Sequence, residues 1–241
     1  MHGLPAPAAG GGNAIAQRSR LHLAAAAWQC APSMAMGVEM LTKLRVARCQ
    51  LGTALDLFVR DADPVSVQTL TCAAMEILGE IAKGMNIDSF MPHALRTFPD
   101  MDIVELQRLQ RKYCNAFKHL TYSTGKLRDD HALLAGFDDG KNDGSLFVAW
   151  YDYQAIEKRM PIAAQVFQVW WFALHEDSLA PDVDRTPFRD AFPNVVGRSR
   201  KEQKQMLVLA IKQHEDDIAI SNHKLTEKLP LCLPSRDFNA P

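Results

Sequence analysis

The chain has 241 residues, of which 27 are Lys or Arg and 28 are Asp or Glu, so its formal net charge is −1. Hydrophobic residues make up 47% and charged residues 23%, as in an ordinary globular domain. This composition excludes collagen, a coiled-coil rod and a wholly disordered chain. The net charge excludes a strongly basic protein of the kind that coats nucleic acid. No run of about 18 apolar residues occurs, so a transmembrane protein is not expected.

Residues 1–36 differ in composition from the rest of the chain. They are rich in Ala, Gly and Pro, and the first acidic residue is Glu39. This composition predicts a flexible, disordered leader, or a segment upstream of the functional start codon. A targeting segment is the alternative, because Arg18 and Arg20 precede a short apolar run. The predicted organisation is a leader over 1–36, a single helical-bundle domain over 37–220 and a frayed C-terminal tail over 221–241.

Helical periodicity begins at Val38, and one apolar face continues to Phe58, broken once at Arg48. Asp63 is a good N-cap and Pro64 suits the first position of a second helix, which Gly84 ends. Residues 85–99 contain two prolines and predict a loop with at most a short helical turn. A third helix is expected to start at Asp100 and to continue to Leu120.

The polar, Gly-containing residues 123–144 predict a long connection. A fourth helix is expected from Leu146 to about Met160, with Ser145 as its cap, and a fifth from Pro161 to about His175. Residues 176–198 predict a loop with one short turn after Thr186-Pro187. The capping box Ser199–Glu202 starts a sixth helix that reaches about Asp217. The sequence therefore predicts an all-α, antiparallel bundle of about five or six helices.

The fifth segment, residues 162–174, has almost no polar face. Trp170, Trp171 and Phe172 are consecutive, so on a helix they cannot all point the same way. Either other elements of the same chain cover them, or a second copy does. We expect a homo-oligomer, most simply a homodimer, formed through the Trp170/Trp171 helix.

Five cysteines lie at scattered positions with no Cys-x-x-Cys pair: Cys30, Cys49, Cys72, Cys114 and Cys232. This pattern predicts five free thiols in a reducing, cytoplasmic compartment, and no zinc site. Glu76 and Glu80 are one helical turn apart, but no Glu-x-x-His accompanies them, so no metal site is expected. No cofactor and no membrane partner are expected either. Asp152 is expected to be a buried acid that pairs with Arg45 or Arg48.

The third helix carries the residues with the most chemistry. On a wheel of 100° per residue, Arg111, Asn115, Lys118 and His119 fall on one side, and we name these four residues the polar stripe. Arg and Lys can hold a phosphate, Asn115 can orient the imidazole, and His119 can accept or donate a proton near neutral pH. Such a set could bind an anion, or cleave RNA without a metal by activating the ribose 2′-OH. The alternative is an ordinary solvated helix face.

The helices with a late polar His resemble the HEPN domain, the helical module named from higher eukaryotes and prokaryotes nucleotide-binding, over residues 38–160. That family's signature is an Arg, often followed by a polar residue, and then a His four to six residues beyond the Arg. Asn115 and His119 match the polar residue and the His, whereas Cys114 occupies the Arg position and Lys112 could replace it. The resemblance implies a helical module that functions as a dimer. The family includes metal-independent endoribonucleases and also members without catalytic activity. The Asn115–His119 helix also resembles that of bacterial proteins with an Asn-x-Phe-Lys-His motif, which implies no activity.

Two functions are therefore expected from the sequence. The first is a helical, homodimeric interaction or binding module whose polar stripe binds an anion, such as RNA or another phosphate-bearing ligand. The alternative is a metal-independent endoribonuclease that uses His119 as its general acid or base. Because Cys114 replaces the family's Arg, any cleavage by the natural chain is expected to be weak or absent.

Overall fold

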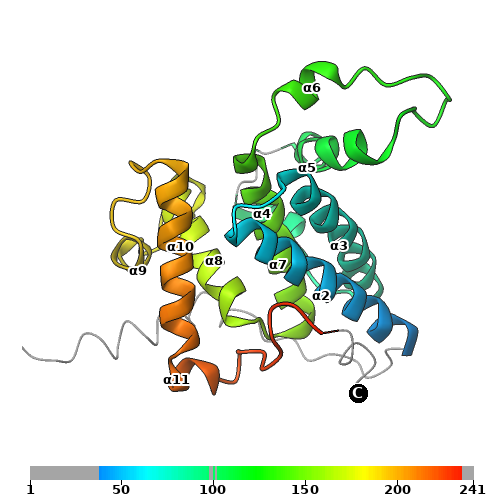
Figure 1. Cartoon of the computed structure of the whole chain (residues 1–241). Helices are drawn as coiled ribbons and strands as arrows, with labels where there is room; N and C mark the ends of the chain where they lie inside the picture. Colours follow the sequence, from blue (N-terminus) through cyan, green and yellow to red (C-terminus); the bar gives the residue numbers. More distant parts are fainter. Residues whose placement is uncertain (1–37, 98–99, 101, 235–241) are drawn as a thin grey trace, which may run out of the picture.

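The computed structural model describes residues 38–97, 100 and 102–234 (Figure 1). In these residues it contains no strand, only two isolated bridges between extended residues, so the all-α prediction is confirmed. The predicted leader and Cys30 lie outside the described residues. In chain order the α-helices are α2 (Val38–Val59), α3 (Pro64–Gly84), α4 (Phe90–Thr97), α5 (Ile103–Lys118), α6 (His131–Ala135), α7 (Asn142–Glu157), α8 (Ile162–Leu174), α9 (Thr186–Ala191), α10 (Arg200–Glu215) and α11 (Ile218–Ser221).

Two predicted helix starts are confirmed by their hydrogen bonds. The Asp63 carboxylate accepts the backbone N–H groups of Val65 and Ser66 at 3.0 and 3.2 Å, at the start of α3. At the start of α10, Ser199 and Glu202 form the complete capping box. Side-chain oxygens thus satisfy N–H groups that have no partner inside their helices.

Some predicted boundaries differ from the structure. The loop predicted over 85–99 contains α4, whose Pro92 lies in the first turn, where a missing N–H costs no helical hydrogen bond. The third helix begins at Ile103 with Asp102 as its cap rather than at Asp100. α7 begins at Asn142, before the predicted cap Ser145.

The helices form two packed groups that share one core. α3 packs against α2, α5 and α7, whereas α8 packs against α9 and α10, and α7 also contacts α8 (Figure 1). Phe58 at the end of α2 lies at the junction, with its ring centroid 5.6 Å from that of Phe167 and 5.9 Å from that of Trp170. All three side chains are fully buried, so aromatic packing joins the two groups.

α8 is covered within the single chain. Trp170 is fully buried and its indole N–H donates to the backbone oxygen of Gln203 at 3.0 Å. Trp171 stacks on Phe147 with a centroid distance of 3.8 Å, and Phe172 packs against Phe188 of α9. No residue of α8 is exposed. Self-association through this helix stays a prediction, but the exposed apolar surface from which it was predicted is not present on α8.

Residues 222–234, which we name the C-terminal strap, are bound to the body, so the prediction of a frayed tail is wrong for them. Arg48 Nε donates to Glu227 Oε2 at 2.9 Å, and its Nη atoms donate to the backbone oxygens of Pro230 and Leu231 at 3.0 and 2.8 Å. Gly52 permits this approach, because a Cβ atom there would lie 2.0 Å from the Leu231 oxygen. The polar break in the α2 face at Arg48 is therefore the attachment point of the strap.

By length and composition alone, one described helix could cross a membrane. It is α3, with 21 residues and a mean hydropathy of 1.2 over its most apolar window. A buried core helix passes the same test, and α3 is packed by α2, α5 and α7.

Candidate functional site

α5 carries three of the four polar-stripe residues on its exposed side. Arg111, Asn115 and Lys118 are exposed, whereas Tyr113 and Cys114 are buried. Tyr113 and Phe117 pack against Phe137, with ring centroids 5.0 and 4.9 Å away. The helix is thus amphipathic, as predicted, with a solvated side that presents a guanidinium, a carboxamide and an ammonium.

His119 lies at the C-terminal end of α5 rather than inside the helix. α5 ends at Lys118, and His119 has the extended backbone angles φ −127° and ψ 122°. Its backbone N–H still donates to the Asn115 oxygen at 3.0 Å. The imidazole is exposed at the C-terminal end of α5.

Lys118 is engaged by its own chain. Its ammonium donates to Glu76 Oε1 of α3 at 2.7 Å. The contact joins α5 to α3 and uses one of the two carboxylates considered as metal ligands. Among the described residues there is no group of three or more His, Cys, Asp or Glu side chains that could hold a metal ion.

A disulfide joins Cys72 of α3 to Cys114 of α5. The prediction of five free thiols is therefore wrong for these two cysteines, while Cys49 and Cys232 are free. The sequence could not show the pairing, because 42 positions separate the two cysteines and they meet only when α5 packs on α3. The cytoplasmic location stays a prediction, but free thiols no longer support it at this pair.

The same disulfide bears on the resemblance to the HEPN signature. Cys114, which stands at the signature's Arg position, is 5% exposed and faces α3. Gln68 of α3 approaches both sulfur atoms from the side, at 3.2 Å from Cys72 Sγ and 4.0 Å from Cys114 Sγ. An Arg at position 114 would therefore be placed in the helix interface and not beside His119.

Beyond α5 the chain forms a short hairpin over residues 119–128, which we name the arm. Thr121 and Leu127 form a bridge, Tyr122 N–H donates to the Lys126 oxygen at 2.8 Å, and Arg128 N–H donates to the Leu120 oxygen at 3.0 Å. Gly125 has a φ of +81°, which suits the turn. In Figure 1 the chain between α5 and α6 stands away from the other helices.

Residues 106–128, which we name the basic segment, include six Lys or Arg and no Asp or Glu. They comprise most of α5 and the arm. The rest of the chain carries 21 Lys or Arg against 28 Asp or Glu. The basic segment is thus a positively charged stretch of an otherwise acidic chain, which the net charge of −1 does not reveal. Two of its cations, Lys118 and Arg128, pair with carboxylates outside the stretch.

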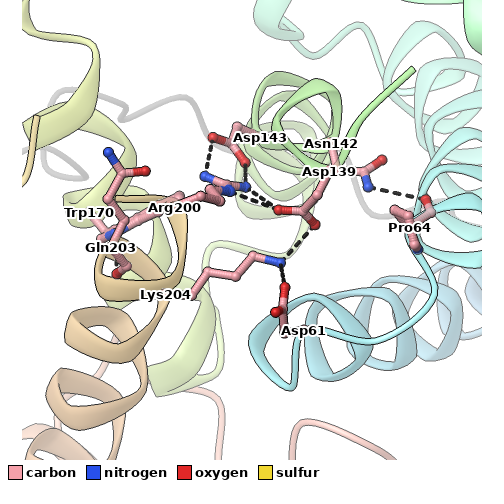
Figure 2. A network of polar contacts seen from close by, with 9 residues as sticks. All are labelled: Asp61, Pro64, Asp139, Asn142, Asp143, Trp170, Arg200, Gln203 and Lys204. Carbon is pink, nitrogen blue, oxygen red and sulfur yellow. Dashed lines mark hydrogen bonds and ion pairs between the residues drawn. The ribbon is translucent and has the colours of Figure 1, made fainter. Parts of the chain in front are cut away.

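A second polar constellation lies between α10, α7 and the turn after α2 (Figure 2). Arg200 donates to the two Asp143 oxygens at 2.9 and 2.5 Å and to Asp139 at 2.7 Å. Lys204, only 3% exposed, donates to Asp61 and Asp139 at 2.8 and 2.7 Å. Burial raises the pKa of Asp143 to about 6, and its hydrogen bonds from Arg200 oppose that rise.

This network holds the two helix groups together. Lys204 and Arg200 lie 4.3 and 5.2 Å from the ring centroid of Phe58, so the cations also cover the aromatic junction. Each carboxylate in Figure 2 is already bound by a cation of the same chain. The arrangement is that of an interhelical clamp, which sequence reasoning missed. The spacing of four between Arg200 and Lys204, and between Asp139 and Asp143, is the signal that could have found it.

Asp152 is buried as predicted, but its predicted partner is wrong. Its Oδ1 atom accepts the backbone N–H of Phe90, at the start of α4, at 2.6 Å, whereas Arg48 binds the strap. Burial raises the pKa of Asp152 to about 7, and the Phe90 hydrogen bond lowers it only in part. A buried carboxyl group with a raised pKa, bound to a backbone N–H, suits a structural role at the α4–α7 contact.

Comparison of the chain with protein-family models, with curated proteins and with solved structures finds no match.

Proposed function

We propose that this protein is a helical binding module whose basic segment binds a phosphate-bearing polyanion. One observation carries the proposal: residues 106–128 hold six cationic side chains and no acidic one, while the remaining chain is acidic. Cationic side chains attract phosphates over roughly a Debye length. When they bind, the counterions of the phosphates are released, and this release contributes to the affinity of the complex.

The positions of the cations support binding rather than a purely structural role. Arg111 on α5 and Lys126 at the arm turn are exposed. Lys118 is paired with Glu76, whose carboxylate is exposed, and such a pair at the protein surface is weak enough to exchange for a phosphate. Arg128 stays bound to Asp130 in a pair that is largely covered. Cationic side chains thus occur both on α5 and in the arm that follows it.

Cleavage of RNA by His119 has less support than binding. A general acid or base must lie within hydrogen-bond reach of the proton it transfers, held by a second group. His119 lies just beyond the end of α5, and the hydrogen bond that joins it to Asn115 is between backbone atoms. We therefore keep the metal-independent endoribonuclease as the alternative, which the His119 variant below tests.

Charge reversal tests the proposed function. Full-length protein is titrated with fluorescently labelled inorganic polyphosphate and with labelled RNA, at several salt concentrations. Arg111→Glu with Lys126→Glu should weaken binding of both probes at least tenfold, and should reduce the slope of log affinity against log salt by about 0.7–0.9 for each lost phosphate contact. Lys43→Glu with Lys212→Glu is the matched control, because it makes the same charge change at exposed residues of α2 and α10. Equal loss in both double variants would refute a localised site.

A further inference from the structure

The arm places an aromatic ring and cations on one face. In an antiparallel pair, residues directly opposite each other point to the same side. The backbone hydrogen bonds place Tyr122 opposite Lys126 and Leu120 opposite Arg128, so these four side chains share a face, while Thr121 and Leu127 share the other. The turn is short, so the ring and the two cations are close neighbours.

Tyr122 is held but not covered. The Arg128 guanidinium carbon lies 4.8 Å from its ring centroid, and Arg128 is itself fixed by two hydrogen bonds to Asp130, at 2.6 and 2.8 Å. Hydrogen bonding by Asp130 raises the pKa of Arg128, so the cation is permanent. Tyr122 nevertheless remains 46% exposed, and Leu120 beside it is 77% exposed. Tyr122 is neither part of the buried core cluster nor packed against it, so the core does not explain an aromatic ring at this position.

We infer that Tyr122 is a stacking site for an unpaired base of a single-stranded nucleic acid, whose phosphates lie along the basic segment. An exposed aromatic ring can stack on a base of any sequence, and nearby cations bind the flanking phosphates. Bases in a duplex are stacked on one another, so their faces are not available to Tyr122. This inference rests on the proposed polyanion-binding function and adds the class of ligand to it.

The test compares three probes of similar charge on the full-length protein: a labelled single-stranded oligouridylate, a labelled RNA duplex and inorganic polyphosphate. The single strand should bind most tightly. Tyr122→Leu should weaken its binding roughly tenfold to hundredfold, the effect of one lost base–aromatic contact, and should leave duplex and polyphosphate binding within about twofold. Tyr122→Phe should keep the wild-type affinity for the single strand.

Leu127→Ala is the matched control, since it changes an exposed apolar residue of the same arm on the opposite face. It should leave all three affinities unchanged. If the three probes bind but Tyr122→Leu weakens them equally, or if duplex and single strand bind alike, the stacking site is refuted while polyanion binding stands. If none of the probes binds, the proposed function fails and the stacking site fails with it. Circular dichroism shows whether each variant keeps its helices.

Discussion

Arg48 and Glu227 form an ion pair across 179 positions of the chain, with only 3% and 10% of their side chains exposed. Arg48 also donates to two backbone oxygens of the C-terminal strap, so a single guanidinium makes three contacts with it. Removing one partner of such a pair leaves a buried charge without compensation, which costs more than the pair itself contributes.

Arg48→Met should therefore destabilise the protein by about 3–5 kcal/mol. Chemical denaturation followed by circular dichroism measures the free energy of unfolding. Arg60→Met is the control, because Arg60 pairs with Asp56 at an exposed site and its loss should cost no more than about 1 kcal/mol. Similar losses in the two variants would contradict a strap anchored at Arg48.

The disulfide between Cys72 and Cys114 should stabilise the fold by about 4 kcal/mol, the chain-entropy value for a loop of this length. A reducing agent should lower the melting temperature by roughly 8–16 °C. Thiol titration of the denatured protein should detect two more thiols after reduction than before it. The double variant Cys72→Ser with Cys114→Ser should melt at the same temperature with and without reductant, and a wild-type protein equally indifferent to reductant would contradict the bond.

Asp152 should make stability depend on pH. Its pKa in the folded protein is about 7 against 3.8 for the ordinary carboxyl group, so between these values the folded chain holds a proton that the unfolded chain has released. Its contribution to stability is therefore present below about pH 4 and is lost as the pH rises through about 7. Asp143 contributes in the same direction, with a folded pKa of about 6.

Asp152→Asn keeps an oxygen that can accept the Phe90 N–H and removes the ionisation. The variant should gain stability relative to the wild type between pH 5 and 8, with both measured by urea denaturation at each pH. Because Asp143 is present in both proteins, the difference between the two curves isolates Asp152. A difference that does not change with pH would show that Asp152 ionises normally in the fold.

His119→Ala tests the enzymatic alternative. If the protein cleaves RNA without a metal, the variant should lose on the order of 10²–10⁴-fold in rate, the usual effect of removing a positioned acid or base. The melting temperature should be unchanged, because His119 is exposed. If the wild type binds RNA but does not cleave it, the binding-module function is retained and the enzymatic alternative is rejected. Cleavage that survives the substitution, or that requires a divalent metal, would contradict the role of His119.

Cys114→Arg restores the residue of the resembled motif, but the fold predicts a different result from the sequence. Restored cleavage is the result expected of a decayed nuclease, whereas the structure places this side chain in the buried α3–α5 contact. An unpaired guanidinium there should destabilise the protein by several kcal/mol. Thermal melting separates the two outcomes, and a stable variant that cleaves single-stranded RNA would favour a decayed nuclease.

Sequence reasoning succeeded where the signal is local. Asp63 before Pro64, and Ser199 three residues before Glu202, act within one helical turn, and the structure has these caps as predicted. It placed the end of the third helix at Leu120, two residues too far, because no Gly or Pro marks the end of α5. Contacts between residues far apart in the chain also cannot be predicted from a local pattern. The Cys72–Cys114 disulfide and the Arg48–Glu227 ion pair are the two examples here.

The Arg48–strap contact has a consequence for the order of folding. Residue 48 is synthesised well before residues 227–231, so α2 and α3 can form a helical hairpin long before the strap exists. In that interval the Arg48 guanidinium has none of its strap partners, so it remains in contact with water, because burying an unpaired charge is costly. A contact between residues 179 positions apart closes a long loop, which costs chain entropy that local helix contacts do not cost. Docking of the strap is therefore the step that replaces water around Arg48 with protein and completes the burial of this part of α2.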